Sequence, residues 1–132
     1  MDRKKILLVD DDMDLLRGLS IRLRASGYDV AFATDGLFAI TQAVEQKPDV
    51  IILDIGLPCG DGFHVLQRLR SLLPVSHIPI IILTARDPST TQERALKGGA
   101  EAFFQKPPDN DKLLAAIQSA LGGPVRDTAG KT

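Results

Sequence analysis

Short apolar runs recur along this chain, and each of them leads directly into a polar residue. The run at 6–9 leads into Asp10 and Asp11, the run at 50–53 into Asp54, the run at 80–83 into Thr84, and the pair at 103–104, through Gln105, into Lys106. Runs without polar alternation are typical of strands buried on both faces, as in the middle of a parallel sheet. These runs predict the strands of such a sheet. Between them, the apolar residues follow a different spacing.

The spacing of the apolar residues between the runs is that of an α-helix. Between the runs, apolar residues recur three or four positions apart, as in the segments around 15–23, 39–44, 65–73 and 113–121. Helix stops and starts fit this reading: Gly27 ends the first segment, Asp87 with Pro88 and then Asp109 open later ones, and Gly122 closes the last. The expected strands are 5–10, 29–33, 49–54, 79–83 and 101–105. Five strand–helix units of this kind predict an α/β fold with a parallel sheet and right-handed crossovers.

Size and composition narrow the function. The chain has 132 residues, and we expect one domain over 1–122 followed by a polar tail or linker start over 123–132. Its 16 basic and 17 acidic residues give no general attraction to nucleic acid or to anionic membranes. One cysteine excludes an intrachain disulfide, and no apolar stretch is long enough for a membrane span or a secretory signal. Cytoplasm is the expected compartment.

The carboxyl ends of parallel strands meet at one edge of the sheet, where α/β proteins bind ligands. Asp10, Asp11 and Asp54 should therefore lie together, and their mutual repulsion calls for a cation. Three carboxylates and a loop carbonyl suit Mg²⁺, which prefers oxygen ligands. The alternative is that the acidic run from Asp10 to Asp12 only caps the following helix. A cap is the role that we expect for Asp12 itself.

Three further side chains complete this candidate site. Asp54 can act as a nucleophile that forms an aspartyl-phosphate, although a single Asp after a strand is often only a turn residue. The Thr84 hydroxyl can donate to a phosphoryl oxygen, and Lys106 can place a point charge there. An ordinary strand threonine and a solvated lysine are the alternatives. A cis Lys106–Pro107 bond would direct the ammonium, but the sequence does not establish it. No function is assigned to Cys59, His64 or His77.

These motifs, in this order and at these spacings over about residues 4–121, resemble the receiver domain of bacterial two-component response regulators. The resemblance is carried by 6–12 (ILLVDDD), 48–58 (PDVIILDIGLP) with Asp61-Gly62, 79–85 (PIIILTA), Gly99-Ala100 and 103–107 (FFQKP). It implies a flavodoxin-like (βα)5 doubly wound sheet of order 2-1-3-4-5. It also implies a phosphoacceptor signalling domain rather than an enzyme acting on other substrates.

The resemblance further implies a role for each residue. Asp54 would accept a phosphoryl group from a histidine kinase or phosphotransfer protein. Asp11 would hold Mg²⁺ directly and Asp10 largely through water, with the Gly56 carbonyl as another ligand. Thr84 would move to the phosphoryl group, and Lys106 would pair with it. Phe103 would be the aromatic switch of the face made by the fourth helix, the fifth strand and the last helix. The implied partners are the phosphodonor and a downstream output protein or domain, with the chain a monomer or weak dimer.

Some positions depart from the family pattern. Phe103 stands where many members have tyrosine, and Gly56 and Arg86 occupy variable places that are thought to tune phosphoryl lifetime. Ala116 and Gln118 replace arginines that are common in regulators with winged-helix output domains. The residues leave three alternative functions to consider. A Mg²⁺-dependent phosphohydrolase would need an acidic residue at position 56, where this chain has glycine, and a flavodoxin-like cofactor binder would need a phosphate-binding loop where the three aspartates 10–12 stand. A degenerate receiver would lack some of the site residues, all of which are present.

Overall fold

The apolar runs form one parallel sheet in a computed structural model that describes residues 3–57 and 62–122. The five strands lie in the order β2-β1-β3-β4-β5. They are β1 (Lys5–Val9), β2 (Asp29–Ala33), β3 (Val50–Leu53), β4 (Ile80–Thr84) and β5 (Ala102–Gln105). The predicted α/β fold and strand order are confirmed, and the predicted strand ends are within one residue of those observed. Thr84 is the last residue of β4, and Asp10 and Asp54 directly follow β1 and β3.

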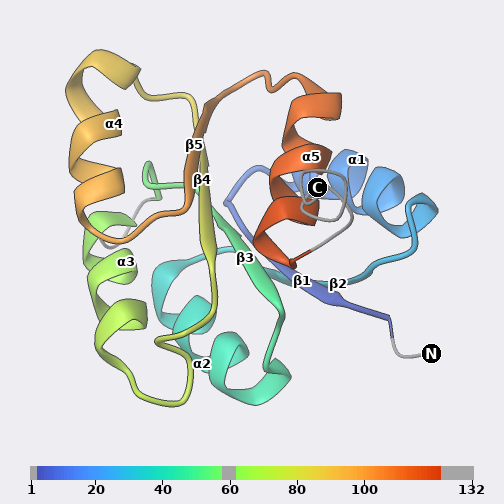
Figure 1. Cartoon of the computed structure of the whole chain (residues 1–132), viewed down its shortest axis with the longest axis horizontal. Helices are drawn as coiled ribbons and strands as arrows, with labels where there is room; N and C mark the ends of the chain where they lie inside the picture. The colour runs from blue at the N-terminus through green and yellow to red at the C-terminus, as the bar shows by residue number, and fades with distance from the viewer. Residues whose placement is uncertain (1–2, 58–61, 123–132) are drawn as a thin grey trace, which may run out of the picture.

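Helices cover both faces of the sheet (Figure 1). They are α1 (Met13–Ala25), α2 (Gly36–Gln46), α3 (Gly62–Ser71), α4 (Pro88–Lys97) and α5 (Asn110–Ala120). The side chains of α1 and α5 share a core with one face of the sheet, and those of α2, α3 and α4 share a core with the other. The central strands β3 and β4 are buried along their whole length, as their unbroken apolar sequence predicted.

Aspartate side chains begin four of the helices. Asp12 accepts hydrogen bonds from the N–H groups of Asp14 and Leu15, and Asp35 opens α2 in the same manner. The predicted caps Asp87 and Asp109 are confirmed at the starts of α4 and α5. Each cap satisfies backbone donors that a helix leaves unpaired at its first turn. They fix where each helix begins relative to the strand before it.

Gly62 allows the start of α3 to pack directly against the backbone of Ile55, two residues after the end of β3. A Cβ atom at this position would lie 2.2 Å from the Ile55 Cα, so only glycine fits without movement. The Gly62 N–H donates to the Ile55 carbonyl at 3.2 Å. This close approach returns the chain to the sheet directly behind Asp54.

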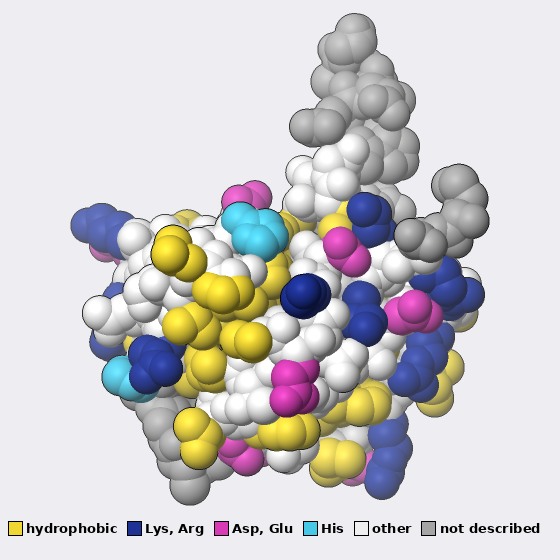
Figure 2. All heavy atoms as spheres, turned by 90° about the horizontal axis from the view of Figure 1, so that it is seen from below, with side chains coloured by type: hydrophobic (Ala, Val, Ile, Leu, Met, Phe, Trp, Pro, Cys, Tyr) yellow, Lys and Arg dark blue, Asp and Glu magenta, His cyan; other side chains and the backbone are white. Residues whose placement is uncertain are grey.

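Several large apolar side chains stay exposed on the helices over the β2-to-β3 half of the sheet. Figure 2 views the molecule from the side where α2 lies in Figure 1 and shows hydrophobic side chains gathered there. Leu37, Phe38 and Val44 of α2 are exposed. Within residues 3–57 and 62–122, no helix combines the length and apolar character needed to cross a membrane. Cys59, Pro58, Asp61 and the predicted tail 123–132 lie outside the described residues.

Candidate functional site

Three carboxylates meet at the carboxyl edge of the sheet, as the strand ends predicted. Asp10 and Asp11 follow β1, Asp54 follows the neighbouring β3, and one oxygen from each lies within 4.8 Å of the others. Asp10 and Asp54 are buried, at 4% and 6% exposure, whereas Asp11 is exposed. The cluster therefore has a closed floor and one open side.

Both oxygens of Asp54 are held. Its Oδ1 accepts a hydrogen bond from the Gly56 N–H at 2.8 Å, and its Oδ2 accepts one from the Lys106 ammonium at 3.1 Å. The backbone bond is the turn that an Asp makes with the residue two positions on. It fixes the direction in which the carboxylate leaves the strand.

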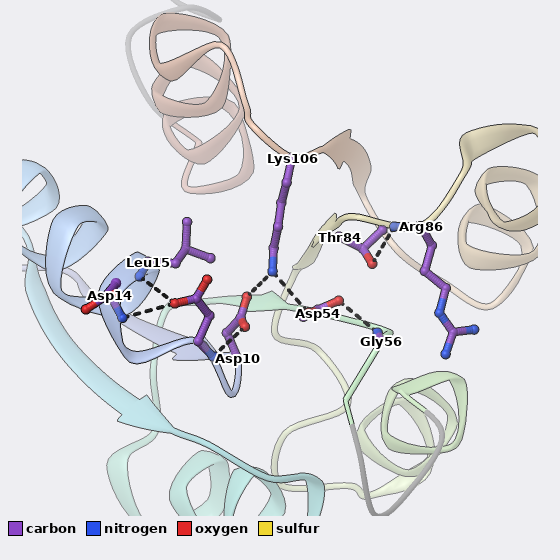
Figure 3. A network of polar contacts seen from close by, with 9 residues as sticks. Asp10, Asp14, Leu15, Asp54, Gly56, Thr84, Arg86 and Lys106 are labelled. Carbon is purple, nitrogen blue, oxygen red and sulfur yellow. Dashed lines mark hydrogen bonds and ion pairs between the residues drawn. The ribbon is translucent and has the colours of Figure 1, made fainter.

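Lys106 reaches down from the end of β5 between two carboxylates (Figure 3). Its Nζ lies 2.7 Å from Asp10 Oδ2 and 3.1 Å from Asp54 Oδ2, and its side chain is only 18% exposed. Burial alone would lower the pKa of Lys106, but the two carboxylates together outweigh that effect and raise it. The ammonium therefore stays charged and neutralises part of the cluster. The Lys106–Pro107 bond, which the sequence left open, is cis.

The environment of Asp10 favours a bound cation. Burial raises the pKa of this carboxyl and the nearby Asp54 charge adds to the rise, although bonds from Lys106 and from the Asp12 N–H oppose it. A carboxylate that is costly to keep ionised is stabilised by added positive charge. Lys106 supplies one positive charge for three carboxylates, and a cation can enter the cluster from the solvent-exposed side at Asp11. This all-oxygen donor set fits Mg²⁺.

Thr84, Gly56 and Arg86 surround the other side of Asp54. A Cβ atom on Gly56 would lie 3.2 Å from Asp54 Oδ1, 3.6 Å from Arg86 Nε and 3.7 Å from Thr84 Oγ1. Thr84 is fully buried, and its hydroxyl accepts a hydrogen bond from the Arg86 N–H at 3.2 Å. The missing side chain at position 56 thus leaves the space among these three groups open.

Phe103 lies in β5, opposite Ile82 of β4. Its ring is partly buried and packs against the core on the α3 and α4 side of the sheet. It therefore lies on the strand next to the one that ends in Thr84.

Sequence reasoning placed these side chains together at this edge of the sheet but missed two contacts. Gly56 was expected to offer its carbonyl, and the structure adds its N–H as the donor that orients Asp54. Lys106 was expected to pair with a phosphoryl group on Asp54, and its contact with Asp10, the shorter of its two carboxylate contacts, was not foreseen. The Asp-x-Gly spacing after a strand could have indicated the first contact. Among the described residues, His64 and His77 belong to no metal-ligand cluster.

A doubly wound parallel sheet that gathers three carboxylates, a lysine and a threonine hydroxyl at its carboxyl edge defines a class of phosphoacceptor signalling proteins. Within that class, the chain belongs to the response regulator receiver domain family, whose model matches residues 6–118. It is thus a receiver domain of a two-component system, as the motifs predicted.

Individual relatives agree. The chain is 40% identical over 116 residues to the transcriptional regulatory protein KdpE of Mycobacterium tuberculosis, covering 88% of this chain and 50% of that protein. The chain thus spans about half the length of the first curated relatives that it matches.

Two solved structures share the whole fold. Chemotaxis response regulator CheY4 of Vibrio cholerae superimposes with a TM-score of 0.82 at 32% identity, covering 91% of this chain and 100% of that one. The receiver domain of the sensor histidine kinase PA1611 from Pseudomonas aeruginosa, solved with a magnesium ion in its active-site cleft, gives 0.84 at 30% identity, covering 92% and 100%.

Proposed function

We propose that Asp54 is the phosphoacceptor of this receiver domain. One carboxylate oxygen attacks the phosphorus of a phosphohistidine on a kinase or phosphotransfer protein, the P–N bond breaks, and the histidine nitrogen leaves with the electron pair. The supporting observation is that Asp54 alone of the three aspartates touches both Lys106 and the open space beside Thr84. The same carboxylate takes the phosphoryl group from small donors such as acetyl phosphate.

Asp10, Asp11, Asp54 and the Gly56 carbonyl would hold Mg²⁺. When bound, the cation supplies positive charge beside the phosphoryl oxygens. The proposal rests on the clustered carboxylates and on the buried setting of Asp10. The magnesium ion in the cleft of the similar PA1611 receiver domain supports it.

Lys106 and Thr84 stabilise the charge that the phosphoryl group brings. Lys106 already points at Asp54, so a small shift of its ammonium reaches a phosphoryl oxygen. The Thr84 oxygen accepts from the Arg86 N–H, and its own O–H can donate to the same phosphoryl group once the side chain moves toward Asp54. That movement vacates space beside β5, and Phe103 is the side chain placed to respond. The α4-β5-α5 face would carry the change to an output partner.

The remaining functional assignments follow from this role. The receiver unit spans 1–122, and 123–132 are a tail or the start of a linker. The chain promotes its own phosphorylation and dephosphorylation but turns over no separate substrate. It works in the cytoplasm as a monomer or weak dimer, meets a histidine kinase or phosphotransfer protein, and signals to an output protein or domain. It does not itself contact nucleic acid.

The test is phosphorylation by acetyl phosphate, followed by intact mass in Mg²⁺ and in EDTA. Wild type gains one phosphoryl group with Mg²⁺ and none in EDTA, and Asp54→Asn gains none in either. Asp49→Asn, at the amino end of β3, is the matched control and should behave as wild type. Equal labelling of wild type and Asp54→Asn would overturn the assignment.

A further inference from the structure

The two outer strands of the sheet expose their edges in different ways. Within the described part of the chain, β2 pairs only with β1 and β5 only with β4, so each carries a row of backbone groups that face outward. Such a row is a template for another strand, and proteins with exposed edges carry features that prevent this pairing. β5 is a strand of only four residues and is followed directly by Lys106 and Pro107. β2 is protected in a different way, by side chains that bind its outward backbone groups.

The outward groups of β2 can be identified from its hydrogen bonds to β1. The Asp29 N–H donates to the Lys4 carbonyl, and the Ala33 carbonyl accepts from the Asp10 N–H. Backbone direction alternates along a strand, so residues 29, 31 and 33 face β1. Tyr28, Val30 and Phe32 therefore turn their backbone groups away from the sheet.

Each of these three outward carbonyls accepts a hydrogen bond from a side chain. Arg3 donates to the Tyr28 carbonyl at 3.3 Å, Arg24 to the Val30 carbonyl at 3.3 Å, and Gln42 to the Phe32 carbonyl at 3.0 Å. We call Arg3, Arg24 and Gln42 the guard residues. They come from the segment before β1, from α1 and from α2, so the edge is enclosed from both faces of the sheet.

Two more contacts hold the guards in place. Arg3 forms an ion pair with Asp29 at 3.1 Å, and the Arg24 guanidinium lies 6.0 Å from the centre of the Phe32 ring. Three successive outward carbonyls along the β2 edge are thus capped by side chains.

The strand beneath the guards would otherwise favour pairing with itself. The first residue of β2, Asp29, is charged, but the rest of the strand (residues 30–33, VAFA) contains neither a charge nor a proline, the two residue types that commonly block edge pairing. In an antiparallel pair of two β2 strands, Val30 of one copy would face Phe32 of the other across a two-fold axis. Each such pair exchanges two N–H to carbonyl bonds. Both carbonyls that it needs are the ones occupied by Arg24 and Gln42.

We propose that the guard residues close the β2 edge against the β2 strand of a second copy of this chain. This keeps sheet extension from joining receiver domains and leaves contacts between copies to the helical faces. The role is independent of phosphorylation at Asp54, because all three guards lie on the β2 side of the sheet, away from Lys106 and Thr84.

The test compares Arg24→Ala/Gln42→Ala with the control Arg22→Ala/Thr41→Ala. The control alters the same two helices, but at side chains that face Pro107 and His64 rather than the β2 edge. Sedimentation gives the mass, and amide hydrogen exchange by NMR reads Val30 and Phe32 directly. In wild type and control, exchange at these two amides does not depend on protein concentration. In the guard variant, both amides become protected as concentration rises, with about a tenfold stronger association for each carbonyl released.

Amide exchange separates this contact from any other dimer, because only β2 pairing protects Val30 and Phe32. A folded guard variant whose two amides exchange as in wild type at every concentration would overturn the proposal. Gln42→Glu is the second variant, since it keeps the side-chain length but replaces the donor by an acceptor. Failure of both variants to fold would also contradict the proposal, because it would show that these side chains support the fold rather than guard its edge.

Discussion

Removing the Lys106 ammonium is expected to destabilise the metal-free protein strongly. The ammonium lies 2.7 Å from Asp10 Oδ2 and 3.1 Å from Asp54 Oδ2, and the three side chains are 18%, 5% and 8% exposed. Lys106→Met keeps the length but leaves two buried carboxylates side by side. Deleting one partner of a buried pair costs about 3–5 kcal/mol, and we expect about 3 kcal/mol because the cluster opens to solvent at Asp11. For a chain of this size that loss lowers the melting temperature by about 10 °C.

The stability that Lys106→Met loses should depend on pH, and it should be largest at high pH. Burial raises the pKa of Asp10, and loss of Lys106 removes a group that opposes the rise. The folded state then takes up a proton before the unfolded state does, so the penalty is full above the raised pKa and shrinks as pH falls through it. Protonation of Asp10 also competes with Mg²⁺ binding, so the affinity of the wild-type protein for Mg²⁺ should fall as the pH falls.

Thermal melting in EDTA, followed by circular dichroism at several pH values, measures the effect. Asp10→Asn/Lys106→Met is the control, because it removes one carboxylate together with the ammonium, and it should recover most of the lost stability. Saturating Mg²⁺ should restore Lys106→Met as well, since the cation replaces the missing charge. Equal melting of wild type and Lys106→Met in EDTA at neutral pH would refute this reasoning.

Three further outcomes are expected. Gly62→Ala should lose about 2–3 kcal/mol of unfolding free energy by denaturant titration, because its Cβ would meet the Ile55 backbone, whereas Gly18→Ala has open space and should be neutral or stabilising. Asp11→Asn should weaken Mg²⁺ binding by about tenfold or more in calorimetry and melt at a higher temperature without metal; unchanged affinity would leave the acidic run as a cap alone. Beryllofluoride should shift the NMR signals of the Phe103 ring in wild type and much less in Thr84→Ala; an unmoved ring in wild type would rule out the switch.

The fold could be predicted because its determinants are local. Unbroken apolar runs such as 50–53 and 80–83 report burial on both faces of a central strand, and helical spacing between them leaves little choice of architecture. The caps at Asp87 and Asp109 were predictable for the same reason, since a cap involves only the next few residues.

The distances between individual side chains at the site could not be predicted from the sequence. The strand ends placed Asp10, Asp54 and Lys106 at one edge, but which carboxylate lies nearer the ammonium depends on side-chain packing across β1, β3 and β5. The guard contacts of Arg24 and Gln42 gave no signal in the sequence, because they join side chains to carbonyls that any residue carries. Contacts of this kind become visible only when the register of the sheet is known.

The central claim is that Asp54 carries the phosphoryl group. Its most direct test is to trap the acyl phosphate: borohydride reduces an aspartyl-phosphate to homoserine, and tandem mass spectrometry then locates that residue. After reaction with a phosphorylated histidine kinase or acetyl phosphate in Mg²⁺, homoserine should appear at position 54 and at neither Asp10 nor Asp11. Homoserine at Asp10 or Asp11, with Asp54 unchanged, would contradict the account.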